Sequence, residues 1–275
     1  MSEKVALVTG SSSGFGLLIC VELAKAGFRV VASMRDLNRR EKLDQAAGPL
    51  APHIDVRKLD VTETPSIEPF VESVLHDYAR IDVLVNNAGF AVAGFAEDLK
   101  LEEIRRQFDT NFFGAVAMTK AVLPIMRRQR SGHIIMISSI GGLVGGAGIS
   151  SYEASKHALE GWSESLRMEV NPFGIKVVLV EPGSYQTDIW TRNAVLGEKT
   201  QDPSSAYIAR SQRLREFAKK LKKRDPIEVA QLVVRIAQDP APKLRFLIGP
   251  DAHIQLWLKR ILPWKSFEKL MAKAF

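Results

Sequence analysis

Residues 4–16 read KVALVTGSSSGFG, a short apolar run that passes directly into a glycine-rich turn. The run Lys4–Val8 is typical of a strand buried on both faces of a sheet. The stretch from Gly14 to Ala26 is typical of a helix, and Gly27 marks its end. The sequence therefore opens with a predicted strand, a tight turn and a helix.

The same alternation continues to about residue 250. Further strands are predicted at Arg29–Ser33, Val56–Leu59, Val83–Asn86, His133–Ser138, Lys176–Val180 and Leu244–Ile248. Helices are predicted between them at Pro65–Tyr78, Leu101–Arg128, Tyr152–Glu169 and Ile227–Gln238. Repeated strand–helix units of this kind favour a parallel sheet covered by helices on both sides, so we expect one α/β domain with three layers.

Composition excludes several other classes of protein. The chain has 275 residues, of which 46% are hydrophobic and 25% charged. These values exclude disorder, collagen and low complexity as descriptions of the whole chain. The single cysteine, Cys20, excludes an intramolecular disulfide framework and a cysteine-based zinc cluster, and the five histidines lack metal-ligand spacing. We therefore expect no metal. We expect a cytoplasmic setting, because no apolar run approaches the length of a membrane span.

Two segments fall outside the alternation. Residues 184–224 form a long excursion after a strand, and we expect a substrate lid there. Its aromatic residues Tyr185 and Trp190 are candidate substrate contacts. Residues 252–275 follow the main domain, 1–251, as a helical extension rich in apolar side chains. That extension is expected to pack on the domain or on a second subunit; the alternative is a peripheral membrane anchor.

The positive charge belongs to the last quarter of the chain. The net charge is +7, and residues 211–275 hold 15 basic and 6 acidic side chains, hence +9. Such a segment indicates a solvated helical face, an anionic membrane surface or nucleic acid. Because Leu214, Phe217 and Leu221 fall on one helical stripe within residues 210–224, we expect that stripe to pack as part of the lid, and we expect no nucleic-acid partner.

The glycine-rich turn is a candidate phosphate site. Glycine lets the backbone approach a pyrophosphate, and the N–H groups and dipole of the following helix favour an anion. The glycine spacing differs from G-x-G-x-x-G, and a plain turn is the alternative. The candidate cofactor residues in this turn are Thr9, Gly10, Ser12, Ser13, Gly14, Phe15 and Gly16.

The end of the second predicted strand bears on cofactor choice. There, Met34 stands where an acidic residue would accept hydrogen bonds from the ribose of NAD, and Arg35 follows. Arginine can grip a phosphate with two hydrogen bonds, so Arg35 favours the 2′-phosphate of NADP(H). By counting from Gly16, Asp36 fits the acidic position, which leaves NAD(H) as the alternative; otherwise Asp36 caps the next helix.

Polar residues gather where other predicted strands end. Tyr152 and Lys156 are four residues apart on one helix face, and Ser138 and Ser139 end a buried strand. Reduction of a carbonyl needs a proton donor at the developing oxyanion. A tyrosine hydroxyl can supply it once a neighbouring Lys⁺ and a nicotinamide cation lower its pKa from near 10.

Together these motifs resemble the classical short-chain dehydrogenase/reductase family over about residues 4–250. They are Thr9-Gly-x-x-x-Gly14-x-Gly16, Asn86-Asn-Ala-Gly89, Asn111, Ser139, Tyr152-x-x-x-Lys156 and Pro182-Gly183. The resemblance implies a seven-stranded Rossmann-type sheet and NAD(P)(H) chemistry.

It also implies a role for each matching residue. Tyr152 is the implied acid/base, Lys156 the implied ribose ligand that lowers the tyrosine pKa, Ser139 the implied substrate-oxygen donor and Asn111 the implied holder of a relay water. The remaining implied cofactor contacts are Asp60, Val61, Asn87, Ala88, Gly89, Pro182, Gly183 and Thr187. From the residues alone, Asp60 could equally cap a turn.

Within that family the sequence is similar to the 17β-hydroxysteroid and retinol dehydrogenase branch. This similarity implies a hydrophobic ketone, aldehyde or alcohol as substrate. The family resemblance implies a homodimer or homotetramer formed through the helices at 101–128 and 152–169. The alternatives are an NAD-dependent alcohol dehydrogenase of the same fold and an NADP-binding sensor without turnover.

Overall fold

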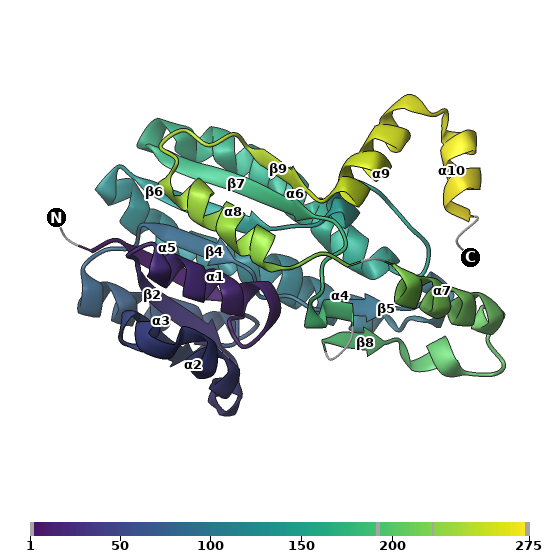
Figure 1. The fold of residues 1–275 in the computed structure, drawn as a ribbon, viewed down its shortest axis with the longest axis horizontal. Helices are drawn as coiled ribbons and strands as arrows, with labels where there is room; N and C mark the ends of the chain where they lie inside the picture. The colour runs from purple at the N-terminus through teal and green to yellow at the C-terminus, as the bar shows by residue number, and fades with distance from the viewer. Residues whose placement is uncertain (1–2, 191–192, 222, 273–275) are drawn as a thin grey trace.

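A seven-stranded parallel sheet forms the centre of the molecule in the computed structural model, which describes residues 3–190, 193–221 and 223–272 and, at position 190, the backbone alone (Figure 1). The strand order is β3-β2-β1-β4-β6-β7-β9. The bounds are β1 (Val5–Thr9), β2 (Arg29–Met34), β3 (Ile54–Lys58), β4 (Val83–Asn86), β6 (Gly132–Ile137), β7 (Ile175–Pro182) and β9 (Arg245–Ile248). Each lies within two residues of its predicted bounds, so the predicted fold class is confirmed.

Helices cover both faces of the sheet. One face carries α1 (Gly14–Lys25), α2 (Glu41–Ala47) and α8 (Ile227–Gln238), and the other carries α3 (Thr64–Tyr78), α5 (Gly114–Gln129) and α6 (Ser150–Val170). Strand β1 shows why its sequence is apolar throughout: Ala6 and Val8 face the first set of helices, while Val5 and Leu7 face the second. Burial on both faces explains the continuous, non-alternating apolar run.

The strand order reverses direction at β1. This strand pairs in parallel with β2 on one side and with β4 on the other. The connections after β1 and β4 therefore leave the sheet on opposite faces, which opens a crevice at the carboxyl ends of these strands. The topology thus places a binding site beside the glycine-rich turn.

The prediction of one uninterrupted helix over residues 101–128 is wrong. The structure has α4 (Leu101–Phe108), a π-helical turn η4 (Asp109–Phe113) and then α5. Inside the turn, the amide of Asn111 bonds both backbone groups of Phe90, which holds it against a neighbouring segment. The apolar periodicity of the sequence carried no sign of this interruption.

Two short strands and several short helices also went unpredicted. β5 (Ala91–Ala93) and β8 (Ala194–Leu196) form a small parallel pair. Three residues are too few to show a strand period. The short helices are η1 (Leu37–Arg39), η2 (Gly48–His53), η3 (Ala96–Asp98), η5 (Ile140–Gly142), η6 (Asn171–Phe173), η7 (Asp188–Trp190) and η8 (Glu198–Gln201).

The lid segment, residues 184–224, ends in helix α7 (Ile208–Lys220). Its expected apolar stripe packs only in part. Leu214 is half-buried, whereas 43% of Phe217 and 41% of Leu221 are exposed. Helix α7 lies at the far edge of the molecule, beyond the end of the sheet, so the later part of its stripe has no core beneath it (Figure 1).

The C-terminal extension is helical, as predicted. It consists of α9 (Pro250–Ile261) and α10 (Trp264–Ala272), so the expected boundary after residue 251 falls within the first turn of α9. The two helices form a hairpin that projects from the body (Figure 1). Over the ranges that the structure describes, no helix combines the length and apolarity needed to cross a bilayer.

Candidate active site

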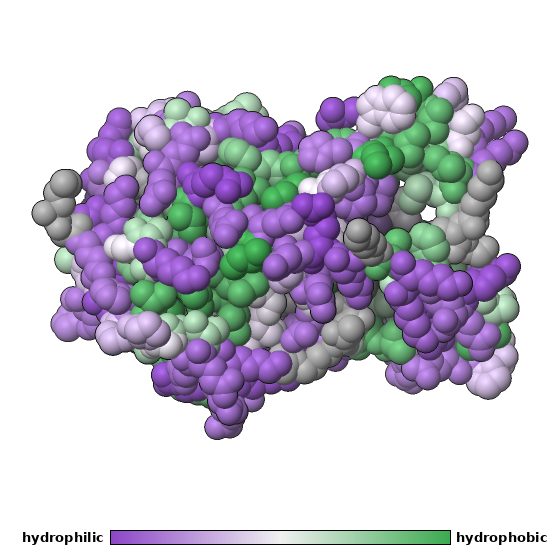
Figure 2. Space-filling model, viewed as in Figure 1, coloured by the Kyte–Doolittle hydropathy of each residue, from purple (hydrophilic) through white to green (hydrophobic). Residues whose placement is uncertain are grey.

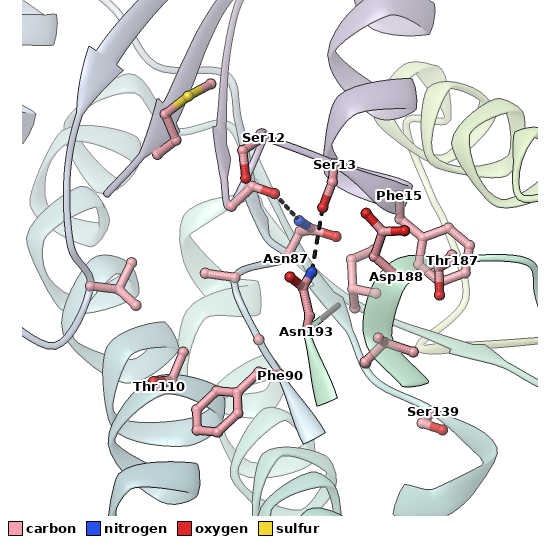
Figure 3. A pocket seen from close by; sticks show the side chains of 18 of the residues that line it. Ser12, Ser13, Phe15, Asn87, Phe90, Thr110, Ser139, Thr187, Asp188 and Asn193 are labelled. Atoms are coloured by element: carbon pink, nitrogen blue, oxygen red, sulfur yellow. Dashed lines mark hydrogen bonds between the residues drawn. The ribbon is translucent and has the colours of Figure 1, made fainter. Parts of the chain in front are cut away.

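A cavity of about 510 Å³ opens at the carboxyl ends of the central strands (Figure 3). It brings together most residues that the sequence nominated. Among its lining residues are Gly10, Ser12, Ser13, Gly14, Phe15, Arg35, Asp60, Val61, Asn87, Ala88, Gly89, Ser139, Tyr152, Lys156, Pro182, Gly183, Tyr185 and Thr187. Thr9, Gly16 and Asn111 lie behind this wall. The side chain of Trp190 lies outside the described part of the chain.

The turn between β1 and α1 fits a pyrophosphate. Gly10 has φ +69°, and a Cβ there would lie 2.7 Å from the Cα of Ala88. Ser13 occupies the N-cap of α1, but its side chain makes no capping bond. The backbone thus comes close to the cavity, and the positive end of a twelve-residue helix points there without a side-chain acceptor.

Thr9 and Gly16 support this turn from behind. The hydroxyl of Thr9 is buried and accepts the N–H groups of Asn87 and Ala88, each over 3.0 Å. A Cβ at Gly16 would lie 2.4 Å from the carbonyl oxygen of Gly10. Helix α1 can therefore pack this closely on the turn only with glycine at position 16.

Asn87 ties the two central strands together. Its Nδ2 donates to the carbonyl oxygens of Thr9 (2.8 Å) and Gly10 (3.0 Å). Across the cavity the lid segment adds Asn193, whose Nδ2 donates to Ser13 Oγ over 3.4 Å (Figure 3). The phosphate region is thus closed by the chain on both sides.

The far end of the cavity is cationic. Arg35 and Arg39 both line it, next to the buried side chain of Met34. Asp36 is engaged elsewhere, because its carboxylate accepts the N–H of Asn38 (3.0 Å) as the N-cap of η1. Asp60 lines the cavity and also accepts two bonds from Thr62, so both of its sequence-based interpretations are compatible with the structure.

Ser139, Tyr152 and Lys156 meet at the opposite end. The side chains of Ser139 and Tyr152 are hydrogen bonded to each other. Burial nevertheless raises the pKa of Tyr152 to about 12. Lys156 Nζ donates to the carbonyl oxygen of Ile137 (2.7 Å) and lies 5.8 Å from the centroid of the Tyr152 ring. Burial lowers the pKa of Lys156 to about 8.

We expected Lys156 and a nicotinamide cation to lower the pKa of Tyr152, whereas the chain without that cation raises it. Tyr152 is only 5% exposed, and withdrawal of its hydroxyl from water outweighs the Ser139 hydrogen bond. A depressed value would therefore depend on additional positive charge in the cavity.

Asn111 occupies the π-helical turn η4. Its Nδ2 donates to the carbonyl oxygen of Phe90 (3.0 Å) and to Ser155 Oγ (3.2 Å). Its Oδ1 accepts the N–H of Phe90 over 3.1 Å. Such turns are frequent at functional sites, and this one places the adjacent Thr110 in the cavity wall. The relay-water role of Asn111 stays a prediction.

A buried carboxylate pair lies behind the candidate catalytic residues. Glu160 and Glu181 are hydrogen bonded to each other and both lie beside Arg245. Burial raises the pKa of both carboxyls, that of Glu181 to about 8. We assign the shared proton to Glu181, since Glu160 also accepts bonds from Arg245 (3.0 Å) and from Ser138.

Tyr185 has a supporting position within the wall. Its hydroxyl donates to Glu228 Oε2 over 3.1 Å, and its ring packs edge-on against Phe15. Met34 and Ser138, which the sequence analysis noted at strand ends but did not nominate, also line the cavity. Sequence reasoning overlooked several further lining residues, which are Arg39, Leu59, Thr62, Phe90, Arg106, Thr110, Ile137, Asp188, Ile189, Asn193 and Val195. Arg39 alone had a usable signal, as a second arginine four residues after Arg35.

The comparisons with known proteins agree with this geometry. The family model described as short chain dehydrogenase matches residues 4–195. The chain belongs to the short-chain dehydrogenase family. This family binds NAD(P), and the chain is accordingly an oxidoreductase that acts on CH–OH groups.

Relatives of this short-chain dehydrogenase match over at least four fifths of their length. An oxidoreductase of Bacillus subtilis (strain 168), YusZ, is 43% identical, with 99% of each chain covered. Retinol dehydrogenase 8 of Homo sapiens is 39% identical over 89% of this chain and 81% of its own. The 3-ketodihydrosphingosine reductase of Bacteroides thetaiotaomicron is 38% identical over 92% of this chain and 91% of its own.

Solved structures of short-chain dehydrogenases share the fold. That of a short-chain dehydrogenase from Streptomyces avermitilis has a TM-score of 0.84 and 36% identity, covering 99% of this chain and 96% of its own. A metagenomic short-chain oxidoreductase in complex with NADP has a TM-score of 0.73 and 26% identity, covering 90% of this chain and 97% of its own.

Proposed function

We propose that this short-chain dehydrogenase uses NADP(H) and interconverts hydrophobic ketones or aldehydes and the corresponding alcohols. The observation that carries the cofactor choice is the pair Arg35 and Arg39 at one end of the cavity, with Asp36 turned away into a helix cap. Two guanidinium groups favour the extra phosphate of NADP(H), whereas a carboxylate facing the ribose would favour NAD(H).

The residues fit the dinucleotide along the whole cavity. The glycine turn and the α1 N-terminus would hold the pyrophosphate, and Lys156 would hold the nicotinamide ribose. When bound there, NADP(H) supplies or accepts the hydride. The chain itself must hold the substrate oxygen and move a proton to or from it.

Ser139 and Tyr152 are placed for that task. Their hydrogen-bonded hydroxyls can converge on one substrate oxygen. During reduction, Tyr152 donates its proton to the oxygen as negative charge develops, and Ser139 donates a second hydrogen bond. The ammonium of Lys156, held on Ile137, stabilises the phenolate that remains. During oxidation the same atoms act in reverse.

The catalytic end of the cavity supports an apolar substrate. Phe90, Ile189 and Val195 line it, and Ile189 and Val195 come from the lid segment. An apolar lining favours the partition of an apolar substrate out of water. The names of two relatives, a retinol dehydrogenase and a 3-ketodihydrosphingosine reductase, support a bulky or long-chain substrate of the retinoid or sphingoid kind.

The assembly proposed for this enzyme is a homodimer or homotetramer through the helices at 101–128 and 152–169. Phe113 and Met168 support this, since each places an apolar side chain, 56% and 72% exposed, on these segments. Sedimentation equilibrium of the purified chain measures the state directly. A monomer at every concentration would contradict the proposal.

The test of the reaction is NADPH consumption with a matched substrate panel. It pairs ketones and aldehydes of one head group with short and long apolar tails, and includes retinal and a 3-keto sphingoid base. The proposal predicts turnover that rises with tail length and disappears in Tyr152→Phe. A protein that binds NADPH but turns over no member of the panel in either direction would count against it.

A further inference from the structure

The C-terminal hairpin carries an apolar face that the rest of the described chain leaves open. In α9, Ile254, Trp257 and Ile261 are 57%, 59% and 52% exposed. Their spacing of three and four residues places them on one stripe. In α10, Trp264 is 62% exposed, whereas the buried ring of Phe267 anchors the helix. Figure 2 shows hydrophobic residues gathered over this hairpin.

Helix α7 lies at the same end of the molecule as the hairpin (Figure 1). Like the hairpin, it carries exposed apolar side chains. Phe217, and Leu221 just beyond the helix, are exposed there among cations. Residues 208–220 include five basic side chains and one acidic, and residues 250–272 include four basic and two acidic. Of these, the described cations Arg210, Arg213, Lys219, Lys220, Arg260, Lys265 and Lys269 are exposed.

Both helices contact the loop that leads into the catalytic helix. Gly148 lies against α7, since a Cβ there would be 2.7 Å from Leu214 Cδ1. Lys259 of α9 donates to the carbonyl oxygen of Leu143. The next residues in the chain lead to Tyr152. The apolar and basic helices therefore flank the approach to the catalytic end of the cavity.

We propose that α7 and the α9–α10 hairpin dock this protein on the surface of an anionic lipid bilayer. Exposed tryptophan and isoleucine beside lysine and arginine are the composition of helices that lie in the membrane interface. A second copy of the chain fits less well, because a two-fold contact would bring two basic surfaces together. The contact would present the active-site entrance to molecules dissolved in the bilayer.

Vesicle binding of the full chain tests this contact. The probes are vesicles of phosphatidylcholine alone and of phosphatidylcholine with phosphatidylglycerol, analysed by flotation at low and at high salt. We expect binding to the anionic vesicles, weakened by salt, with a blue shift of tryptophan fluorescence. Two double variants should each weaken binding to anionic vesicles by about tenfold or more. One combines Trp257→Ser with Trp264→Ser, and the other combines Lys265→Glu with Lys269→Glu.

The control is Leu37→Ser, which removes an exposed apolar side chain from η1 and should leave vesicle binding unchanged. Equal binding by wild type and both double variants would overturn the proposal. So would a tryptophan variant that converts a dimer into a monomer without any change in vesicle binding, since the face would then be a contact between copies. These measurements use no substrate, so they stand apart from the test of the reaction.

Discussion

Ser138 Oγ donates a hydrogen bond to Glu160 Oε1 over 2.5 Å, next to the candidate catalytic residue Ser139. Glu160 lies one helical turn after Lys156 on α6, and its negative charge raises the pKa of that lysine against the effect of burial. Arg245 joins the carboxylate to Glu181 at the end of β7. The ends of two strands and the catalytic helix are therefore held by one charged cluster.

We predict that Glu160→Gln shifts the pH dependence of reduction to more acidic values. Loss of the carboxylate charge lowers the pKa of Lys156 further below about 8, so the ammonium that stabilises the Tyr152 phenolate is lost at a lower pH. The measurement is kcat/KM against pH. The control is Glu164→Gln, which changes another partner of the same arginine on the exposed side. An unchanged alkaline limb in Glu160→Gln would contradict the assigned role.

Glu181→Gln should stabilise the fold at alkaline pH. Burial raises the folded-state pKa of Glu181 from its ordinary value of 4.5 to about 8, so its protonated form stabilises the fold at low pH. That contribution is lost as pH rises from the unfolded value through about 8. The variant cannot ionise, and its Tm should exceed that of the wild type by a few degrees near pH 9 but not near pH 5. A Tm difference independent of pH would contradict the assignment of the proton.

Tyr152→Phe should abolish turnover while it preserves cofactor binding. General acid catalysis commonly contributes about 10²–10⁴ in rate, and the variant removes only the hydroxyl from a buried site. The expected result is a fall of about that size in kcat with an unchanged Kd for NADPH. Ser139→Ala is the matched comparison and should lose less, because it removes a hydrogen bond but not the proton. Retained activity in Tyr152→Phe would refute the mechanism.

Gly10→Ala should weaken both the fold and the phosphate site. The residue has φ +69°, and a Cβ there would come within 2.7 Å of Ala88 Cα, so the turn must open. Backbone strain of this kind costs about 1–3 kcal/mol. Gly27→Ala provides the control, because its φ of +84° is similar but no atom lies within 4 Å of the added Cβ. Equal effects of the two changes on NADPH affinity would contradict the account of the turn.

The seven strands could be predicted from the sequence because a strand that is buried on both faces is apolar at every position. Val5 to Val8 is such a run. The sequence also indicated that Ser139, Tyr152 and Lys156 lie together, because Ser139 follows a buried strand and the other two share a helix face. Their catalytic roles stay a prediction. Local sequence patterns could not identify residues that reach the cavity through contacts between distant segments. Asn193 and Val195 reach the cavity only because β8 pairs with β5, and each strand is three residues long.

The electrostatic part was harder to predict than the geometry. We expected Lys156 and a nicotinamide cation to lower the pKa of Tyr152. Burial depends on the packed core, and it raises the pKa of Tyr152 and lowers that of Lys156. The pair Glu160 and Glu181 likewise has no local pattern, since 21 positions separate its members and only the packing of α6 on β7 brings them together.

The most direct test of the central claim is a fluorescence titration of wild type, Arg35→Ala, Arg39→Ala and Asp36→Asn with NADPH and with NADH. We expect tighter binding of NADPH by the wild type, loss of that preference in each arginine variant, and little change in Asp36→Asn. Equal or tighter binding of NADH by the wild type, with a loss in Asp36→Asn, would overturn the NADP(H) assignment and make this chain an NAD-dependent dehydrogenase.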